Sequence, residues 1–183
     1  MRLFVAVELE GNLRDKAAEI ENKIKECGCD VKLVEPENLH FTVKFLGEVR
    51  EEHVKDIESK ISGALENIKG FKLGLEGVGY FGSPKHISVL WIGLHEGREE
   101  FVKLTEEIGR SLSHIRREER KPSPHLTIGR VKSGTGREKL LEAISSMKHV
   151  KLGEMDVKFV KLKRSMLAPE GPAYSDVKTF ELG

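Results

Sequence analysis

Two copies of a short pattern combine side chains that exchange protons with side chains that donate hydrogen bonds. His40-Phe41-Thr42-Val43 and His125-Leu126-Thr127-Ile128 each read histidine, apolar, threonine, apolar. An imidazole titrates near neutral pH, and a threonine hydroxyl beside it can donate to an oxygen that gains negative charge. With seven His and five Thr among 183 residues, a Thr two places after a His is expected less than once by chance. We therefore treat these two histidines and two threonines as candidate site residues.

Two imidazoles on one site suit an in-line displacement at phosphorus. One takes a proton from the entering oxygen, the other protonates the leaving oxygen, and the threonines bind the non-bridging oxygens. The scheme requires no metal, and we expect neither metal nor cofactor. The chain contains no His-x-x-x-His and no Gly-x-x-x-x-Gly-Lys segment, and Cys27 and Cys29 are too few for a zinc site or a disulfide framework.

Both motifs lie in stretches that read as β-strands. Alternate strand residues share a face, so His40 and Thr42 project together, about 6.6 Å apart along the chain, while the apolar residues face a core. Lys44 is expected on the face of Thr42, as a substrate contact or as a solvated side chain. Arg130 is three residues after Thr127, so it reaches the face of that threonine only if the strand kinks.

The chain reads as an internal duplication with an offset of about 85 residues. Each half shows a short apolar strand, an amphipathic helix, the His-x-Thr strand, a second helix and a further strand. The apolar stripes of the four expected helices are Leu13, Ala17, Ile20 and Ile24; Val54, Ile57, Ile61, Leu65 and Ile68; Phe101, Leu104, Ile108, Leu112 and Ile115; and Leu140, Ile144 and Met147. We expect one catalytic domain, residues 1–183, built of two pseudo-symmetric lobes from repeat halves of about 1–85 and 86–183. The two motifs would then face each other across a cleft.

Composition narrows the class of protein. Charged residues make up 33% of the chain, Gln is absent and only four Asn occur, a balance typical of heat-adapted proteins. The net charge of +1 gives little long-range attraction to a polyanion. The sequence shows neither a signal peptide nor a membrane span. We expect a soluble, cytoplasmic monomer that does not bind membranes.

The surroundings of both motifs resemble the RNA 2′,3′-cyclic phosphodiesterases, also called 2′-5′ RNA ligases, of the two-histidine (2H) phosphoesterase superfamily. The resemblance runs from end to end, through residues 2–9, 36–47, 89–93, 124–130 and 171–174. Phe41 and Gly129 stand where Leu and Ala are commoner in that family. The fold implied is α+β and LigT-like, with two lobes whose mainly antiparallel sheets face a central cleft and carry helices outside.

The resemblance implies an enzyme that opens a terminal 2′,3′-cyclic phosphate of RNA, tRNA fragments included. Water would expel the 3′-oxygen and leave a 2′-phosphate. With an RNA 5′-hydroxyl as the nucleophile, the same displacement would form a 2′-5′ bond without ATP. We assign His125 as the base and His40 as the acid, with the reverse assignment left open. Arg130 would join Thr42 and Thr127 in binding the phosphate.

Phe81 and Tyr174 lie in Gly/Pro-rich segments expected to be loops, where they would stack on a terminal base or simply pack. Two alternative functions stay open. One is a 2H phosphoesterase for another cyclic phosphate or a 2′-5′ oligonucleotide. The other is a non-catalytic module that clamps an RNA terminus. Arg and Lys bind phosphate better than His does, so the paired histidines favour catalysis.

Overall fold

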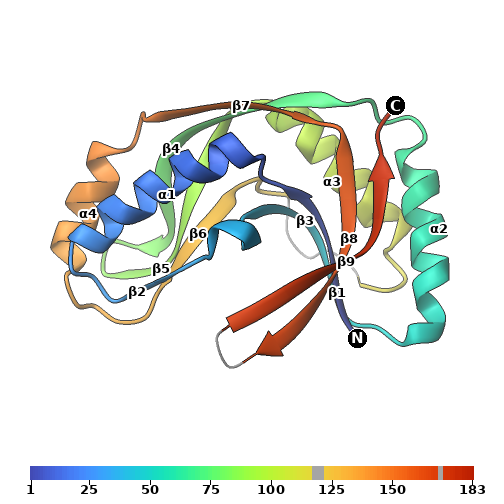
Figure 1. The fold of residues 1–183 in the computed structure, drawn as a ribbon, viewed down its shortest axis with the longest axis horizontal. Helices are drawn as coiled ribbons and strands as arrows, with labels where there is room; N and C mark the ends of the chain where they lie inside the picture. The colour runs from blue at the N-terminus through green and yellow to red at the C-terminus, as the bar shows by residue number, and fades with distance from the viewer. Residues whose placement is uncertain (117–121, 169–170) are drawn as a thin grey trace.

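The computed structural model describes residues 1–116, 122–168 and 171–183 (Figure 1). The strands are β1 (Arg2–Glu8), β2 (Val31–Leu33), β3 (His40–Glu48), β4 (Phe71–Ser83), β5 (His86–Glu96), β6 (Leu126–Val131), β7 (Lys151–Val157), β8 (Phe159–Ala168) and β9 (Gly171–Glu181). The helices are α1 (Gly11–Glu26), α2 (Val54–Leu65), α3 (Arg98–Ser111) and α4 (Arg137–Ser146), with 3₁₀ turns at Pro36–Asn38 and Glu51–His53.

The four expected helices are confirmed, and the apolar stripe predicted for each is buried except at Val54 and Ile115, which are partly buried. Leu13, Ala17, Ile20 and Ile24 form the buried side of α1, and Phe101, Leu104 and Ile108 form that of α3. α2 packs against α3 at one end of the molecule and α1 lies beside α4 at the other (Figure 1). No helix among the described residues has the length and apolar character needed to cross a membrane.

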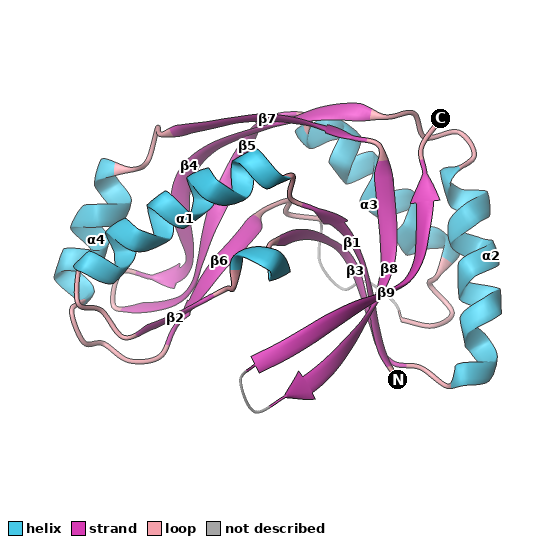
Figure 2. Ribbon diagram, in the orientation of Figure 1, coloured by secondary structure: helices cyan, strands magenta, loops and turns pink. Residues whose placement is uncertain are grey.

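The strands form one curled sheet in the order β7-β4-β5-β6-β3-β1-β8-β9, and β2 pairs with β6 beside this path (Figure 2). One lobe holds β1, β3, β8 and β9, and the other holds β4 to β7 and β2. The expected two-lobe α+β fold with antiparallel pairing is confirmed. The two expected sheets are joined into one, because β3 and β6 meet at the antiparallel pair Phe41–Leu126.

Each lobe takes strands from both halves of the chain. β4 follows α2 in sequence, but it pairs with β5 and β7, whereas β8 crosses over to pair with β1. This exchange ties the lobes together. The division into repeat halves near residue 85 remains a prediction.

Candidate active site

The two His-x-Thr motifs lie on neighbouring strands at the junction of the lobes. Phe41 pairs with Leu126, the apolar residue at the same position of the other motif. Because the strands are antiparallel, His40 lies toward Thr127 across this pair. Phe41 is fully buried and its ring lies 5.8 Å from that of Phe101 on α3, so the histidines and threonines project from the opposite face of the sheet, away from that helix.

Each imidazole is held by a main-chain carbonyl two residues before it. Nδ1 of His40 lies 2.7 Å from the oxygen of Asn38, and Nδ1 of His125 lies 2.5 Å from the oxygen of Ser123. A carbonyl oxygen only accepts, so Nδ1 donates in both cases and Nε2 is left to exchange a proton. The same device in both motifs gives two imidazoles of the same tautomer.

An aromatic ring stands edge-on against each imidazole. Tyr174 lies 5.4 Å from His40 at 89°, and Phe81 lies 4.7 Å from His125 at 90°. The ring of Phe4 adds a second contact to His40 at 5.0 Å. Phe81 and Tyr174 were expected in loops, but they lie in β4 and β9, because the Gly/Pro-rich segments form paired strand ends. Both rings therefore help to hold the imidazoles.

Burial lowers the pKa of both histidines below the ordinary value near 6.5. For His40 the Asn38 carbonyl raises the pKa, the Lys163 ammonium lowers it and the Glu8 carboxylate raises it, all by less than burial does. For His125 the Ser123 carbonyl opposes the effect of burial. Among the described residues, charged groups therefore shift the pKa of His40 but not that of His125.

These charges belong to a square of ion pairs across β1, β8 and β9. Lys161 contacts Glu8 at 2.6 Å and Asp176 at 2.7 Å, and Lys163 contacts Asp176 at 2.5 Å as well as Glu8. Glu8 pairs with His40 in the register of β1 and β3, which brings the square to the edge of the site. Although burial raises the pKa of Glu8, the two lysines hold it below its ordinary value.

A bulge follows the threonine of each motif and decides which later side chain reaches the site. The β1–β3 register passes from Thr42 to Lys44, and the β5–β6 register passes from Thr127 to Gly129, so one residue is skipped in each strand. A bulge turns the following residues to the other face. Phe45 and Arg130, each three residues after its threonine, therefore return to the face of the site.

The bulge after Thr42 contradicts the expectation for Lys44, and the bulge after Thr127 meets the condition set for Arg130. Lys44 does not share the face of Thr42: it is 1% exposed, and Phe45, 52% exposed, lines the site instead. The kink required for Arg130 is present, and this side chain lines the same cavity as Thr127. Arg130 also lowers the pKa of Tyr174, although burial, the larger effect, raises it.

Two cavities flank the motifs, one on each side. The first, about 630 Å³, is lined by His40, both threonines, Phe45, Arg130 and Tyr174, together with Lys32, Lys132, Glu35 and Glu37 at its rim. The second, about 640 Å³, is lined by His125, Phe81 and Trp91. Thr42, Thr127 and Arg130, the residues expected to bind the phosphate, thus line the same cavity as His40. His125 lines the other cavity.

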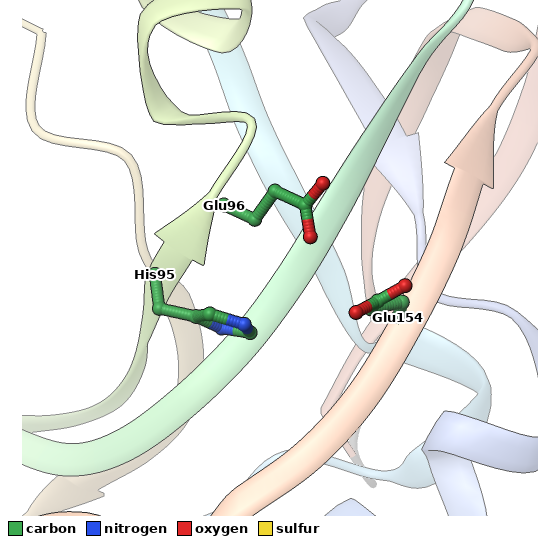
Figure 3. Close-up of side chains that lie close together, drawn as sticks. All are labelled: His95, Glu96 and Glu154. Atoms are coloured by element: carbon green, nitrogen blue, oxygen red, sulfur yellow. The ribbon is translucent and has the colours of Figure 1, made fainter.

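One cluster outside the site has the donor types of a metal site. His95 and Glu96 on β5 and Glu154 on β7 bring three ligand atoms within 4.8 Å of one another (Figure 3). All three residues are exposed, and Lys72 lies 3.7 Å from Glu154. None of them lines either cavity, so we assign this cluster no part in the chemistry of the motifs.

Phe45, Trp91 and Lys163 were missed by the sequence reasoning. Phe45 was hidden by the bulge, because an unbroken strand would point it into the core. Lys163 lies on a strand whose pairing with β1 spans the whole chain. Trp91 did carry a signal: it is the only Trp, and it lies in an expected apolar strand.

Comparison with known proteins agrees with this geometry. The family described as LigT like Phosphoesterase matches the chain twice, over residues 7–91 and 92–174. The chain belongs to the LigT-like phosphoesterase family. The resemblance stated from the motifs is thereby confirmed, and the protein is an enzyme of the phosphoesterase class.

Relatives of this LigT-like phosphoesterase align over nearly their whole length. The RNA 2′,3′-cyclic phosphodiesterase of Methanothermobacter thermautotrophicus is 41% identical, with 100% of this chain and 99% of the relative covered. The protein of the same name from Methanocaldococcus jannaschii is 40% identical, with 98% and 100% covered. A crystal structure of a Thermus thermophilus protein has a TM-score of 0.85 at 29% identity, with 100% and 98% covered. The structure of E. coli LigT complexed with 3′-AMP, at 22% identity and a TM-score of 0.78, with 99% and 97% covered, shares the fold.

Proposed function

We propose that this phosphoesterase hydrolyses the terminal 2′,3′-cyclic phosphate of RNA to a 2′-phosphate, with His40 and His125 as the acid–base pair. The observation that carries the proposal is the matched placement of the two imidazoles, each with Nδ1 bound to a carbonyl and Nε2 left to exchange a proton. Relatives named RNA 2′,3′-cyclic phosphodiesterase, at about 40% identity over the whole chain, support this substrate.

In this mechanism His125 removes a proton from water as the water attacks phosphorus. The P–O3′ bond breaks, and His40 gives its proton to the departing 3′-oxygen. Thr42, Thr127 and Arg130 donate to the non-bridging oxygens, where negative charge gathers. The cavity that holds these three donors also holds His40, so the nucleoside carrying the leaving oxygen is placed there. Tyr174 and Phe81 keep the imidazoles in place.

The reverse direction uses the same groups in exchanged roles, and an RNA 5′-hydroxyl in place of water gives a 2′-5′ bond without ATP. One chain supplies both histidines, which is why we propose that a monomer is active. RNA ends, such as those of tRNA fragments, are the proposed partners, and the cytoplasm stays the predicted location. The proposed reaction requires no metal or cofactor.

The test is ³¹P NMR of a short RNA ending in a 2′,3′-cyclic phosphate, incubated with the protein in EDTA. We expect the cyclic phosphate signal to give way to that of a 2′-phosphate monoester. A 3′-phosphate product would contradict the assigned leaving group. A cyclic phosphate that persists would favour another cyclic substrate, or a module that binds the RNA end without turnover.

A further inference from the structure

The cavity beside His125 is a groove along β4 to which the proposed hydrolysis assigns no part of the RNA. β7 pairs with β4 only as far as Glu76. The main-chain N–H groups of the next two residues, Gly77 and Val78, donate hydrogen bonds to carbonyls in the turn after α4. Beyond Val78, among the described residues, β4 has a strand neighbour only in β5. The groove of about 640 Å³ lies along this segment and opens at His125.

The floor of the groove is aromatic. Trp91 lies against Gly79 and Gly93: a Cβ atom on Gly93 would stand 3.2 Å from a ring carbon, and one on Gly79 would lie closer still. Side chains at both positions would push the indole off the sheet. Phe81 follows at 5.7 Å from Trp91 and reaches His125. Nε1 of Trp91 is buried and has no hydrogen-bond partner in the described part of the chain. Aromatic surfaces of this kind stack on nucleic-acid bases without regard to sequence.

The rim of the groove is cationic. Arg98, at the start of α3, and Lys148, just after α4, both line it and both are exposed. Neither forms an ion pair with any residue that the structure describes. One carboxylate, Glu76, also lines the groove, and His149 lies 3.8 Å from it. An aromatic floor with cations at the rim matches a nucleoside followed by a phosphodiester.

The geometry of an in-line displacement at phosphorus identifies the nucleoside that this groove would hold. The entering and leaving oxygens lie on opposite sides of phosphorus in an in-line reaction. The nucleoside with the cyclic phosphate lies on the His40 side, so the entering oxygen arrives from the side of His125. Water needs no aromatic groove of this size. We infer that the groove binds the 5′-terminal nucleoside of a second RNA strand, whose 5′-hydroxyl replaces water.

This inference rests on the proposed function, ligation included, and adds the place where the second RNA strand binds. His125 takes the proton of the 5′-hydroxyl, the O5′–P bond forms, the P–O3′ bond breaks, and His40 gives its proton to the 3′-oxygen. The product is a 2′-5′ phosphodiester with a free 3′-hydroxyl, and solvent returns both histidines to their starting protonation states. In the reverse reaction the groove holds the nucleoside that leaves a 2′-5′ bond.

The test measures ligation and hydrolysis in one tube, with one RNA ending in a cyclic phosphate and a second with a 5′-hydroxyl. Lys148→Glu repels the second strand, and Ser145→Phe fills the groove from α4. Lys139→Glu and Glu142→Phe are matched controls on exposed positions of α4 that do not line the groove. We expect the ligation-to-hydrolysis ratio to fall at least about tenfold in both groove variants and to stay constant in the controls.

A ratio that stays constant in both groove variants would overturn the inference. So would a wild-type protein that hydrolyses the cyclic phosphate but neither forms nor cleaves a 2′-5′ bond, while the proposed hydrolysis would stand. A wild-type protein that leaves the cyclic phosphate intact would instead refute the proposed function.

Because Trp91 is the only Trp, its fluorescence reports directly on the groove. A dinucleotide with a 5′-hydroxyl and no terminal phosphate should quench this fluorescence to saturation in the wild type and in Lys139→Glu. Binding should weaken in Lys148→Glu. An unquenched Trp91 at saturating dinucleotide would contradict stacking in the groove, whatever the catalytic assays show.

Discussion

His40 and His125 are fixed by the main chain two residues before them, so their tautomer does not depend on any neighbouring side chain. Nδ1 is committed to a carbonyl, and Nε2 is therefore the atom that exchanges a proton in the proposed reaction. Burial disfavours the charged ring in both cases, so both pKa values lie below the ordinary value near 6.5. Two members of the square of ion pairs, Lys163 and Glu8, shift the pKa of His40, and no described charged group shifts that of His125. The two histidines therefore differ in their electrostatic surroundings.

These shifts predict the pH dependence of catalysis. The proposed reaction needs one imidazole neutral and the other protonated, a state most populated between the two pKa values of the free enzyme. Because both pKa values are lowered, kcat/KM should follow a bell with its maximum on the acidic side of about 6.5. Stopped assays across the pH range, with pH stability checked separately, measure the profile. A maximum above neutral pH would contradict the assigned burial effect.

At the scale of elements, the bulges after Thr42 and Thr127 decide the composition of the site. An unbroken β3 would present Lys44 to the cleft, and an unbroken β6 would turn Arg130 away from it. The sequence pattern carries no mark of a skipped residue, so the face of Thr42 and His40 was predictable, but the face of Lys44 was not. The position of Arg130 was expected only through the resemblance to a family.

The face assignment gives a matched pair of substitutions. Arg130→Met should lower kcat/KM by about tenfold to a hundredfold, because it removes a charged donor to the phosphate. Lys44→Met should reduce stability, with kcat/KM per folded molecule unchanged, because Lys44 is buried away from the cleft. Steady-state kinetics and thermal melts of both variants distinguish the two effects. Equal losses of kcat/KM would show that the faces are wrongly assigned.

The helices could be predicted from sequence because each apolar stripe has a local period of 3.6 residues that packing preserves. The β8–β9 hairpin could not. Along β8 the buried Val160 and Leu162 alternate with Lys161 and Lys163, and Lys163 is itself buried because it pairs with two carboxylates from other strands. Such an alternation indicates a strand with one buried face. No local pattern shows which strands it pairs with or that Lys163 on the other face is buried as well.

For the molecule as a whole, the exchange of strands between the lobes means that both halves of the chain are needed to build the site. β6 and β3 are the two middle strands in the order of the sheet, and both histidines lie at their junction. The duplication and its two lobes could be inferred from the repeated motifs. The crossing of β4 and β8 between lobes could not, because it depends on pairings between distant segments.

This exchange predicts that the first half does not fold alone. A fragment of residues 1–85 keeps β4 but loses β5 and β7, and keeps β1 but loses β8. Unpaired strands of this length leave many main-chain groups and apolar faces exposed. Circular dichroism of the fragment should show no cooperative thermal transition, and mixing it with residues 86–183 should restore one. A cooperative transition in the isolated fragment would refute the prediction.

The central claim is that His40 and His125 act in the same displacement. Its most direct test is kcat/KM for hydrolysis of an RNA 2′,3′-cyclic phosphate by His40→Ala, His125→Ala and the double variant, each confirmed as folded by circular dichroism. We expect each single variant to lose about a hundredfold to ten-thousandfold, and the double variant to lose little more than the worse of the two. Either single variant retaining wild-type activity would contradict the two-histidine account.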